Sequence, residues 1–117
     1  DLWVRGDAAL LEMALSNLLQ NAIEFSPPGE AIQIHASSDQ SNGLVVTVKD
    51  HGPGIPMYAL ERAFDHFYSL QRPKSGKKSS GLGLCIVREI MELHGGSATL
   101  ENVADHGALA TVRFPQG

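Results

Sequence analysis

The feature that most constrains the fold is a change of hydrophobic period across Pro27-Pro28-Gly29. Before this breaker, apolar residues recur at helical spacing, and Asp7 is placed to cap the helix; they are Leu11, Leu15, Leu18, Ala22 and Phe25. After it, residues 31–37 alternate between apolar and polar, and the turn signal Asn42-Gly43 leads into a second run at residues 44–49. The chain therefore predicts a long helix followed by an antiparallel hairpin with one buried face.

The remaining elements continue this alternation. We expect a short helix after Pro56, a helix over residues 83–94 ended by Gly95-Gly96, and closing strands at 97–101 and 108–114. Residues 69–80 are basic, contain Ser and Gly and show no periodicity, so they predict a mobile loop. Amphipathic helices with a mostly antiparallel sheet indicate an α/β fold class, a two-layer α+β sandwich.

Composition limits the kinds of partner. The 117 residues suit one compact domain, residues 1–117. The 13 acidic and 9 basic side chains give a net charge of -4, which argues against general affinity for nucleic acid or anionic membrane. A single cysteine, Cys85, excludes an internal disulfide, and the five histidines lack metal-ligand spacing.

Asn17 and Asn21 lie four residues apart in the long helix pattern, so a helix projects both amides from one face. An amide oxygen is a hard, neutral ligand suited to Mg²⁺, which takes much of its remaining shell from water and phosphates. The alternative is that both amides are merely solvated on the polar side of the helix.

A second motif, Asp50-x-Gly52-x-Gly54, follows the second predicted strand. A carboxylate at the end of a buried strand needs a hydrogen-bond donor. The exocyclic amine of adenine offers one, whereas guanine presents a carbonyl oxygen there, so the motif predicts ATP over GTP. Gly52 and Gly54 would let the backbone approach the base and sugar. An ordinary turn of Asp and Gly is the competing interpretation.

Gly81 and Gly83 open a helix directly after the basic loop, a geometry in which backbone N–H groups bind phosphate. The P-loop and Rossmann glycine patterns are both absent from the sequence. Four loop cations are candidates for phosphate contacts, or are simply solvated: Arg72, Lys74, Lys77 and Lys78. The aromatic residues of Phe64-x-x-Phe67-Tyr68 are interpreted as apolar anchors at the near end of the loop.

In chain order, the asparagine pair, the Asp50 motif, the aromatic motif and the glycine motif resemble the N, G1, F and G2 boxes of the ATP-binding domain of bacterial sensor histidine kinases, a GHKL family. The similarity extends to Ile55-Pro56 and to the closing segment 107–115. It implies the Bergerat fold, with three helices on a mixed, mostly antiparallel sheet and nucleotide held under a lid. The segments 67–70 and 79–84 also look like those of the carbon-source-responsive membrane sensor kinases.

The resemblance also implies a site and partners. Asn17 and Asn21 would be catalytic, with Asn21 as the Mg²⁺ ligand. The expected ATP contacts are Asn17, Asn21, Phe25, Asp50, Gly52, Gly54, Ile55, Tyr68, Arg72, Lys74, Gly81, Leu82, Gly83 and Leu84. The expected partners are the dimerisation domain that carries the phosphoacceptor histidine and a response regulator. The domain would be cytoplasmic, in a longer parent protein anchored in the bacterial inner membrane.

Three positions and the histidines bear on the reaction. ATPases that share this fold place a general-base Glu where this chain has Asn17, so ATP would be kept for transfer rather than hydrolysed. None of the five histidines lies in a phosphoacceptor motif. Glu24 stands where the family commonly has a basic residue, and Ser79 replaces a frequent lid glycine. A serine kinase of the anti-sigma or mitochondrial type and a nucleotide-sensing module without transfer activity remain as alternatives.

Overall fold

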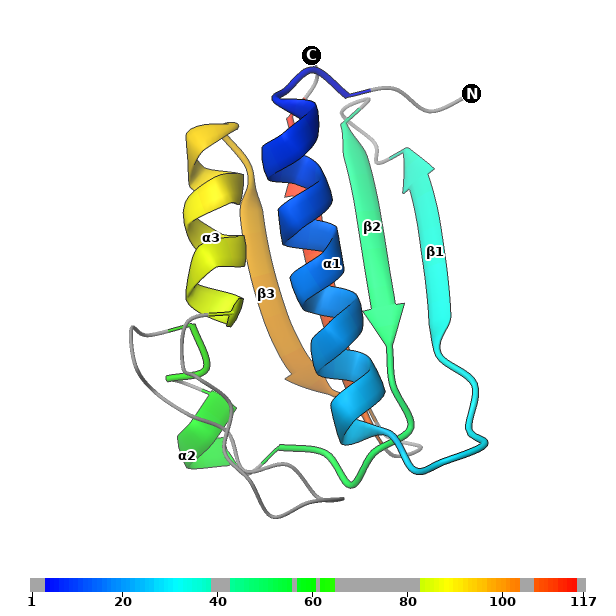
Figure 1. Cartoon of the computed structure of the whole chain (residues 1–117). Helices are drawn as coiled ribbons and strands as arrows, with labels where there is room; N and C mark the ends of the chain where they lie inside the picture. The colour runs from blue at the N-terminus through cyan, green and yellow to red at the C-terminus, as the bar shows by residue number, and fades with distance from the viewer. Residues whose placement is uncertain are drawn as a thin grey trace.

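The computed structural model describes residues 4–38, 43–55, 57–60, 62–64, 83–103 and 107–115. In chain order the elements are α1 (Ala8–Phe25), β1 (Gln33–Ser38), β2 (Leu44–Lys49), α2 (Met57–Leu60), α3 (Gly83–Leu93), β3 (Ser97–Asn102) and β4 (Ala108–Phe114). Figure 1 shows α1 and α3 side by side across one face of the sheet, which confirms the predicted two-layer α/β architecture.

The described strands form a four-stranded sheet in the order β1-β2-β4-β3. Each of its pairings is antiparallel, in agreement with the mostly antiparallel sheet that was expected. The central strands β2 and β4 pair Val46 with Val112 and Val48 with Ala110, all four buried. The closing strand β4 is buried along most of its length.

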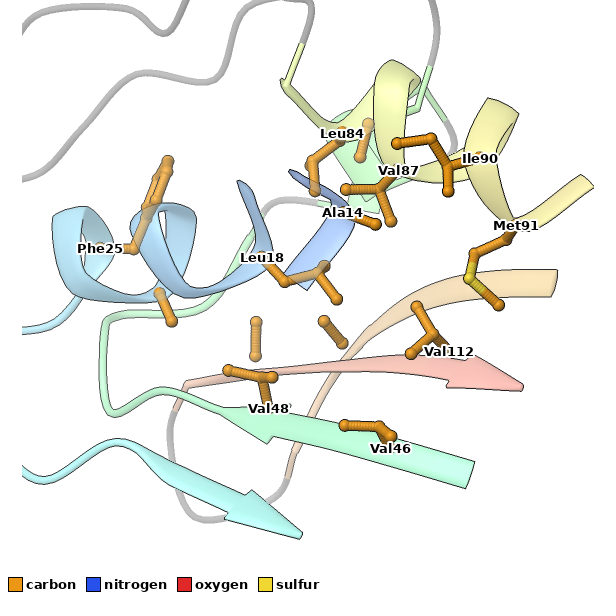
Figure 2. Close-up of a cluster of buried hydrophobic side chains, with 14 of the residues drawn as sticks. Ala14, Leu18, Phe25, Val46, Val48, Leu84, Val87, Ile90, Met91 and Val112 are labelled. Atoms are coloured by element: carbon orange, nitrogen blue, oxygen red, sulfur yellow. The ribbon is translucent and has the colours of Figure 1, made fainter. Parts of the chain in front are cut away.

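Helix α1 begins and ends where the sequence predicted. The Asp7 carboxylate accepts a hydrogen bond from the Leu10 backbone N–H at 3.0 Å, a cap that is worth about 1 kcal/mol. The helix ends at Phe25, immediately before Ser26 and the prolines, because proline cannot continue the backbone hydrogen-bond pattern. Figure 2 shows Leu18 pointing from α1 toward the strands, and the buried residues of the helix are Ala14, Leu18, Ala22 and Phe25.

The end of α3 is tied to the start of α1. Gly95 adopts a φ of 74°, the left-handed stop that was predicted, and the Gly96 N–H returns to the Met91 carbonyl at 2.8 Å. The His94 ring donates from Nδ1 to the Ile90 carbonyl at 2.7 Å and accepts the Asp7 N–H on Nε2 at 3.0 Å. The histidine therefore has a structural role beyond that of a helix-terminal residue.

One prediction about the hairpin was wrong. Strand β1 was expected to bury its apolar face, yet Ile34 is 57% exposed and Ala36 is exposed as well. Figure 1 shows the reason, because α1 and α3 lie over β2, β4 and β3 and leave β1 uncovered at the edge. The hairpin pairing itself is present, from Gln33↔Lys49 to Ser38↔Leu44.

Several element ends gather at one end of the molecule. The C-terminal end of α1, the N-terminal end of α3, the end of β2 and the end of β3 all lie toward the bottom of Figure 1. The segment that was expected to be a mobile loop, residues 69–80, lies outside the described residues. Among the helices that the structure does describe, none combines the length and the apolar character required to cross a bilayer.

Candidate functional site

Asp50, which follows the last residue of β2, is the most deeply buried carboxylate of the described chain. Its Oδ1 accepts two backbone hydrogen bonds, from Gly52 N–H and from Ala108 N–H, each at 3.0 Å. The donor expected for this carboxylate is thus partly supplied by the protein itself. The second oxygen, Oδ2, has no hydrogen-bond partner among the described residues, which is unusual for a buried carboxylate oxygen.

The Asp50 carboxylate lies here because its Oδ1 takes the place of a backbone acceptor in the pairing of this segment with β4. The Asp50 N–H still donates to the Ala108 carbonyl at 3.0 Å, as in a regular antiparallel pair, but the Ala108 N–H turns to the side-chain oxygen. Gly107 precedes Ala108 with a φ of 99°, and a Cβ there would overlap the Asp50 backbone carbonyl. Only glycine combines this conformation with so close an approach.

The rest of the loop after Asp50 is fixed by further hydrogen bonds. The His51 N–H donates to the buried Ser26 hydroxyl at 3.1 Å, and the His51 ring donates from Nδ1 to the Ala31 carbonyl. A Cβ at Gly52 would overlap the Phe25 carbonyl oxygen, so the loop lies against the end of α1. Gly54 has a φ of 86°, and the next residue, Ile55, is buried.

Asn102 holds the far end of the same loop. Its side-chain oxygen accepts the Ile55 N–H at 2.8 Å, and its amide nitrogen donates to the Ile55 carbonyl at 2.7 Å. Residues 50–55 are therefore held at both ends by β4 and β3, and in the middle by the segment that follows α1.

The first of the two asparagines of α1, Asn17, lies beside the start of α3. Asn17 and Asn21 are both partly buried and occupy one helix face, one turn apart. A Cβ at Gly83, the first residue of α3, would lie 4.0 Å from Asn17 Oδ1. Neither amide has a hydrogen-bond partner among the described residues. The structure thus brings two of the sequence motifs together, 66 positions apart in the chain by the numbering of Asn17 and Gly83.

Apolar side chains lie beside these polar groups. Phe25, Ile55 and Leu84 are all buried in the described structure. Figure 2 shows Phe25 pointing from α1 away from the strands, in contrast to Leu18, which points toward them.

Other expected site residues fall outside this description. Tyr68, Arg72, Lys74, Gly81 and Leu82 all lie outside the described residues, so their ATP contacts stay predictions. Phe64, the first residue of the aromatic motif, is partly buried and packs against the core, as expected of an anchor. Among the described residues, no cluster of three or more His, Cys, Asp or Glu could hold a metal ion.

Two residues near the site have clear local roles. Glu24 accepts a hydrogen bond from the Gln20 side chain at 2.9 Å, one turn earlier on α1. Cys85 is buried in the first turn of α3, where it is a small core residue. Burial, followed by the negative charge of Glu89, raises the pKa of the Cys85 thiol, so the group is expected to be a poor nucleophile.

Sequence reasoning missed three residues of this arrangement: Ser26, Asn102 and Gly107. The hydroxyl of Ser26 and the amide of Asn102 act on loop residues far along the chain, and nothing in their immediate neighbours marks them. Gly107 lies in the closing segment that supported the family resemblance, although no role was assigned to it. Its position before a buried strand was the available signal.

The comparisons with known proteins agree with this geometry. Residues 6–117 match the family described as histidine kinase-, DNA gyrase B-, and HSP90-like ATPase. The chain is 50% identical over 111 residues to the sensor protein CreC of Escherichia coli, which fits the carbon-source-responsive type expected from the sequence. This match covers 95% of the chain and 23% of the relative, so the chain spans less than a quarter of that protein's length.

Solved structures of the same kind are similar throughout the chain. The catalytic domain of the histidine kinase ThkA superposes with a TM-score of 0.85 at 32% identity, covering 99% of this chain and 74% of that one. Full-length ShkA in complex with AMPPNP matches with a TM-score of 0.77 at 27% identity, covering 96% of this chain and 22% of that one. The fold is therefore the α/β Bergerat fold of histidine kinase catalytic domains.

Proposed function

The chain belongs to the family of histidine kinase-, DNA gyrase B-, and HSP90-like ATPases, and from this premise we propose that it is the ATP-binding catalytic domain of a two-component sensor histidine kinase. In the reaction, the bond between the γ-phosphorus of ATP and the bridging oxygen breaks, a bond to a histidine nitrogen of the dimerisation domain forms, and ADP leaves. The observation that carries the proposal is the buried Asp50 carboxylate, which has one oxygen paired to the backbone and the other without a hydrogen-bond partner among the described residues.

Asp50 recognises the adenine base in this proposal. Its Oδ2 would accept the exocyclic amine of adenine, while Oδ1 is held by Gly52 and Ala108. Guanine would set a carbonyl oxygen against the carboxylate and leave it without a donor, a loss of about 1–3 kcal/mol. Because Oδ1 already has two donors, the carboxylate is oriented before the base arrives, and binding does not have to order it.

Asn17 and Asn21 serve the phosphate end of the nucleotide. Their amides are unpaired within the described chain, and that of Asn17 lies beside the first residue of α3, where helix N–H groups attract anions. A Mg²⁺ ion fits this donor set, because it keeps several waters and shares phosphate oxygens, so one protein oxygen from Asn21 would suffice. When bound, the ion neutralises charge on the phosphates.

The residues beside the phosphates favour transfer to a positioned acceptor over hydrolysis. Asn17 stands where the hydrolysing members of this fold carry a Glu, and an amide does not act as a general base for water. In-line transfer needs mainly alignment and neutralised charge, which helix N–H groups and the asparagines can contribute. The lid residues Tyr68, Arg72 and Lys74 are proposed to complete the contacts, with Gly81 and Leu82 leading into α3.

The proposed setting is a longer protein. Residues 1–117 would form its catalytic domain, and a dimerisation domain of the same protein would present the acceptor histidine. A response regulator would receive the phosphoryl group on an aspartate. The parent protein is proposed to be anchored in the bacterial inner membrane, with this domain on the cytoplasmic side.

A nucleotide-sensing module without transfer activity is the second candidate, and Glu24 is the observation that favours it. The family commonly has a basic residue there, whereas this chain places a carboxylate at the same end of α1 as Asn21. A carboxylate near a triphosphate weakens binding unless it faces away or assists the metal.

Calorimetric titration of the chain with ATP and GTP, each with and without Mg²⁺, tests the proposal. We expect ATP to bind with help from Mg²⁺ and GTP to bind at least tenfold more weakly. Addition of γ-labelled ATP with a dimerisation domain from the parent protein should then give acid-labile phosphohistidine. ATP binding without any phosphoprotein would favour the sensing module, label on serine would favour a serine kinase, and no binding of either nucleotide would reject the kinase assignment.

A further inference from the structure

The most specific contact of the site not assigned by any sequence motif is that between Asn102 and Ile55. Asn102 is the last residue of β3, and its side-chain amide pairs with both backbone groups of Ile55, at 2.8 and 2.7 Å. One orientation of the amide satisfies both bonds, since the oxygen must accept and the nitrogen must donate. The amide thereby reproduces the two-bond exchange of an antiparallel residue pair, and the loop end acts as an added partner of the sheet.

The residues around this contact, on β3 and in the loop, fix where the Asn102 amide can lie. Asn102 lies on the same face of β3 as Ala98 and Leu100, which pack against the core under the helices. This face of β3 therefore extends from Ala98 and Leu100 at the core to Asn102 at the loop. A Cβ at Gly54 would lie 3.0 Å from Asn102 Oδ1, and Gly54 has a φ of 86°, so a larger residue there would disturb the amide as well as the backbone.

The position of Asn102 also links it to the carboxylate. In the sheet register it is paired with Ala108, whose N–H and carbonyl both engage Asp50. The two ends of the loop, Asp50 and Ile55, are thus held by neighbouring positions on β4 and β3. Loss of the Ile55 hydrogen bonds would leave the loop attached at Asp50 and at His51, with its far end held by the buried Ile55 side chain but no longer by the sheet.

We propose that Asn102 is a positioning residue that holds the loop of residues 50–55 in its nucleotide-binding shape, an inference that rests on the proposed function. Asn102 does not itself touch the base in this account. It sets affinity by keeping Gly54 and Ile55 in place, so that binding does not have to order the loop. Loss of Asn102 should weaken the contacts to adenine and leave those to the phosphates unchanged. The loss of affinity should therefore be the same for every adenine nucleotide, whatever its number of phosphates.

The test compares three variants of the chain. Asn102→Ala removes both hydrogen bonds, and Asn102→Asp keeps the size but sets a carboxylate against the Ile55 carbonyl. Leu100→Ala, on the same strand and face, lowers stability without touching the loop. For each protein we would measure the dissociation constants of ATP and ADP, the Tm without nucleotide, and hydrogen exchange at the Ile55 amide.

The two Asn102 variants should weaken ATP and ADP by the same factor, about tenfold for two neutral hydrogen bonds, and should speed exchange at Ile55. Leu100→Ala should lower Tm and leave both dissociation constants within twofold of the unmodified chain. If the Asn102 variants lower Tm but bind both nucleotides normally, Asn102 is only structural and the inference fails alone. If the unmodified chain binds no adenine nucleotide, the proposed function fails, and the inference fails with it.

Discussion

The two ends of the proposed nucleotide site differ in how their polar groups are satisfied. At the adenine end, residues 50–55 are held by hydrogen bonds to Ser26, Asn102 and Ala108 without any ligand. At the phosphate end, the amides of Asn17 and Asn21 have no partner among the described residues. The loop assigned to adenine is therefore part of the fold, whereas the two amides assigned to phosphate and metal are not tied into it, and we propose that they are left for the ligand. Substitutions that remove these hydrogen bonds should lower folding stability at the first end, and substitutions of the two asparagines should lower nucleotide affinity alone at the second.

The largest effect is expected from Gly107→Ala. The substitution forces a side chain into a φ of 99° and against the Asp50 carbonyl, so the loop and the end of β4 must separate. We expect a loss of about 3–4 kcal/mol in the free energy of unfolding, measured by urea denaturation. Gly29→Ala is the matched control, because Gly29 has a φ of 87° with no atom within 4 Å of a Cβ. It should lose only about 1–2 kcal/mol. Equal losses would mean that contact with Asp50 does not set the stability of this end.

Asp50→Asn should separate folding from binding within the adenine end. The asparagine oxygen can still accept the N–H groups of Gly52 and Ala108, so the apo Tm should fall little. Its amide nitrogen would replace Oδ2 and face the adenine amine donor to donor. We expect ATP binding to weaken by about 1.5–3 kcal/mol, measured by calorimetry. The control is Asp50→Ala, which should lose stability as well as affinity; an Asp50→Asn variant that binds ATP normally would contradict the assigned role of Oδ2.

The contrast also explains what could be predicted from the sequence. Helix α1, its Asp7 cap and the burial of Asp50 follow from local spacing and from short-range capping rules, and all three are present in the structure. The Asn102 contact joins residues 47 positions apart, and the Asp50 contact with Ala108 spans 58 positions. Such pairs depend on sheet register, which a single sequence does not specify at a loop end.

Exposure of β1 could not be predicted for a related reason. Ile32, Ile34 and Ala36 alternate in the way that a half-buried strand requires, yet only the first of these packs against the core. Which strands the helices cover is decided by strand order, and the order β1-β2-β4-β3 puts β1 at the edge. Alternation therefore indicated the strand correctly and its environment incorrectly.

At the phosphate end, Asn21→Ala should affect binding and leave the fold intact. Alanine favours the helix by about 0.5 kcal/mol over asparagine, so the apo Tm should stay level or rise slightly. ATP affinity in the presence of Mg²⁺ should fall about fivefold to thirtyfold, while affinity without Mg²⁺ should change much less. Ser16→Ala, an exposed site on the same helix, is the control for helix propensity. A fall in Tm without a change in Mg²⁺ dependence would contradict the view that this amide is reserved for the ligand.

The smallest effect is expected from Glu24→Lys. Whether this substitution tightens or weakens ATP binding shows whether the Glu24 carboxylate opposes the triphosphate or helps to hold the metal. The substitution removes the hydrogen bond from Gln20, a partly exposed i,i+4 contact worth about 0.3 kcal/mol. A cation near the triphosphate should tighten ATP about twofold to fivefold, more than ADP, and the gain should shrink at high salt because exposed charges are screened. Glu12→Lys makes the same change of charge at an exposed position three turns earlier on α1 and should alter neither affinity.

If Glu24→Lys instead weakens ATP binding only when Mg²⁺ is present, the Glu24 carboxylate helps to hold the metal. The phosphate end would then resemble the adenine end, with a side chain already placed for its ligand.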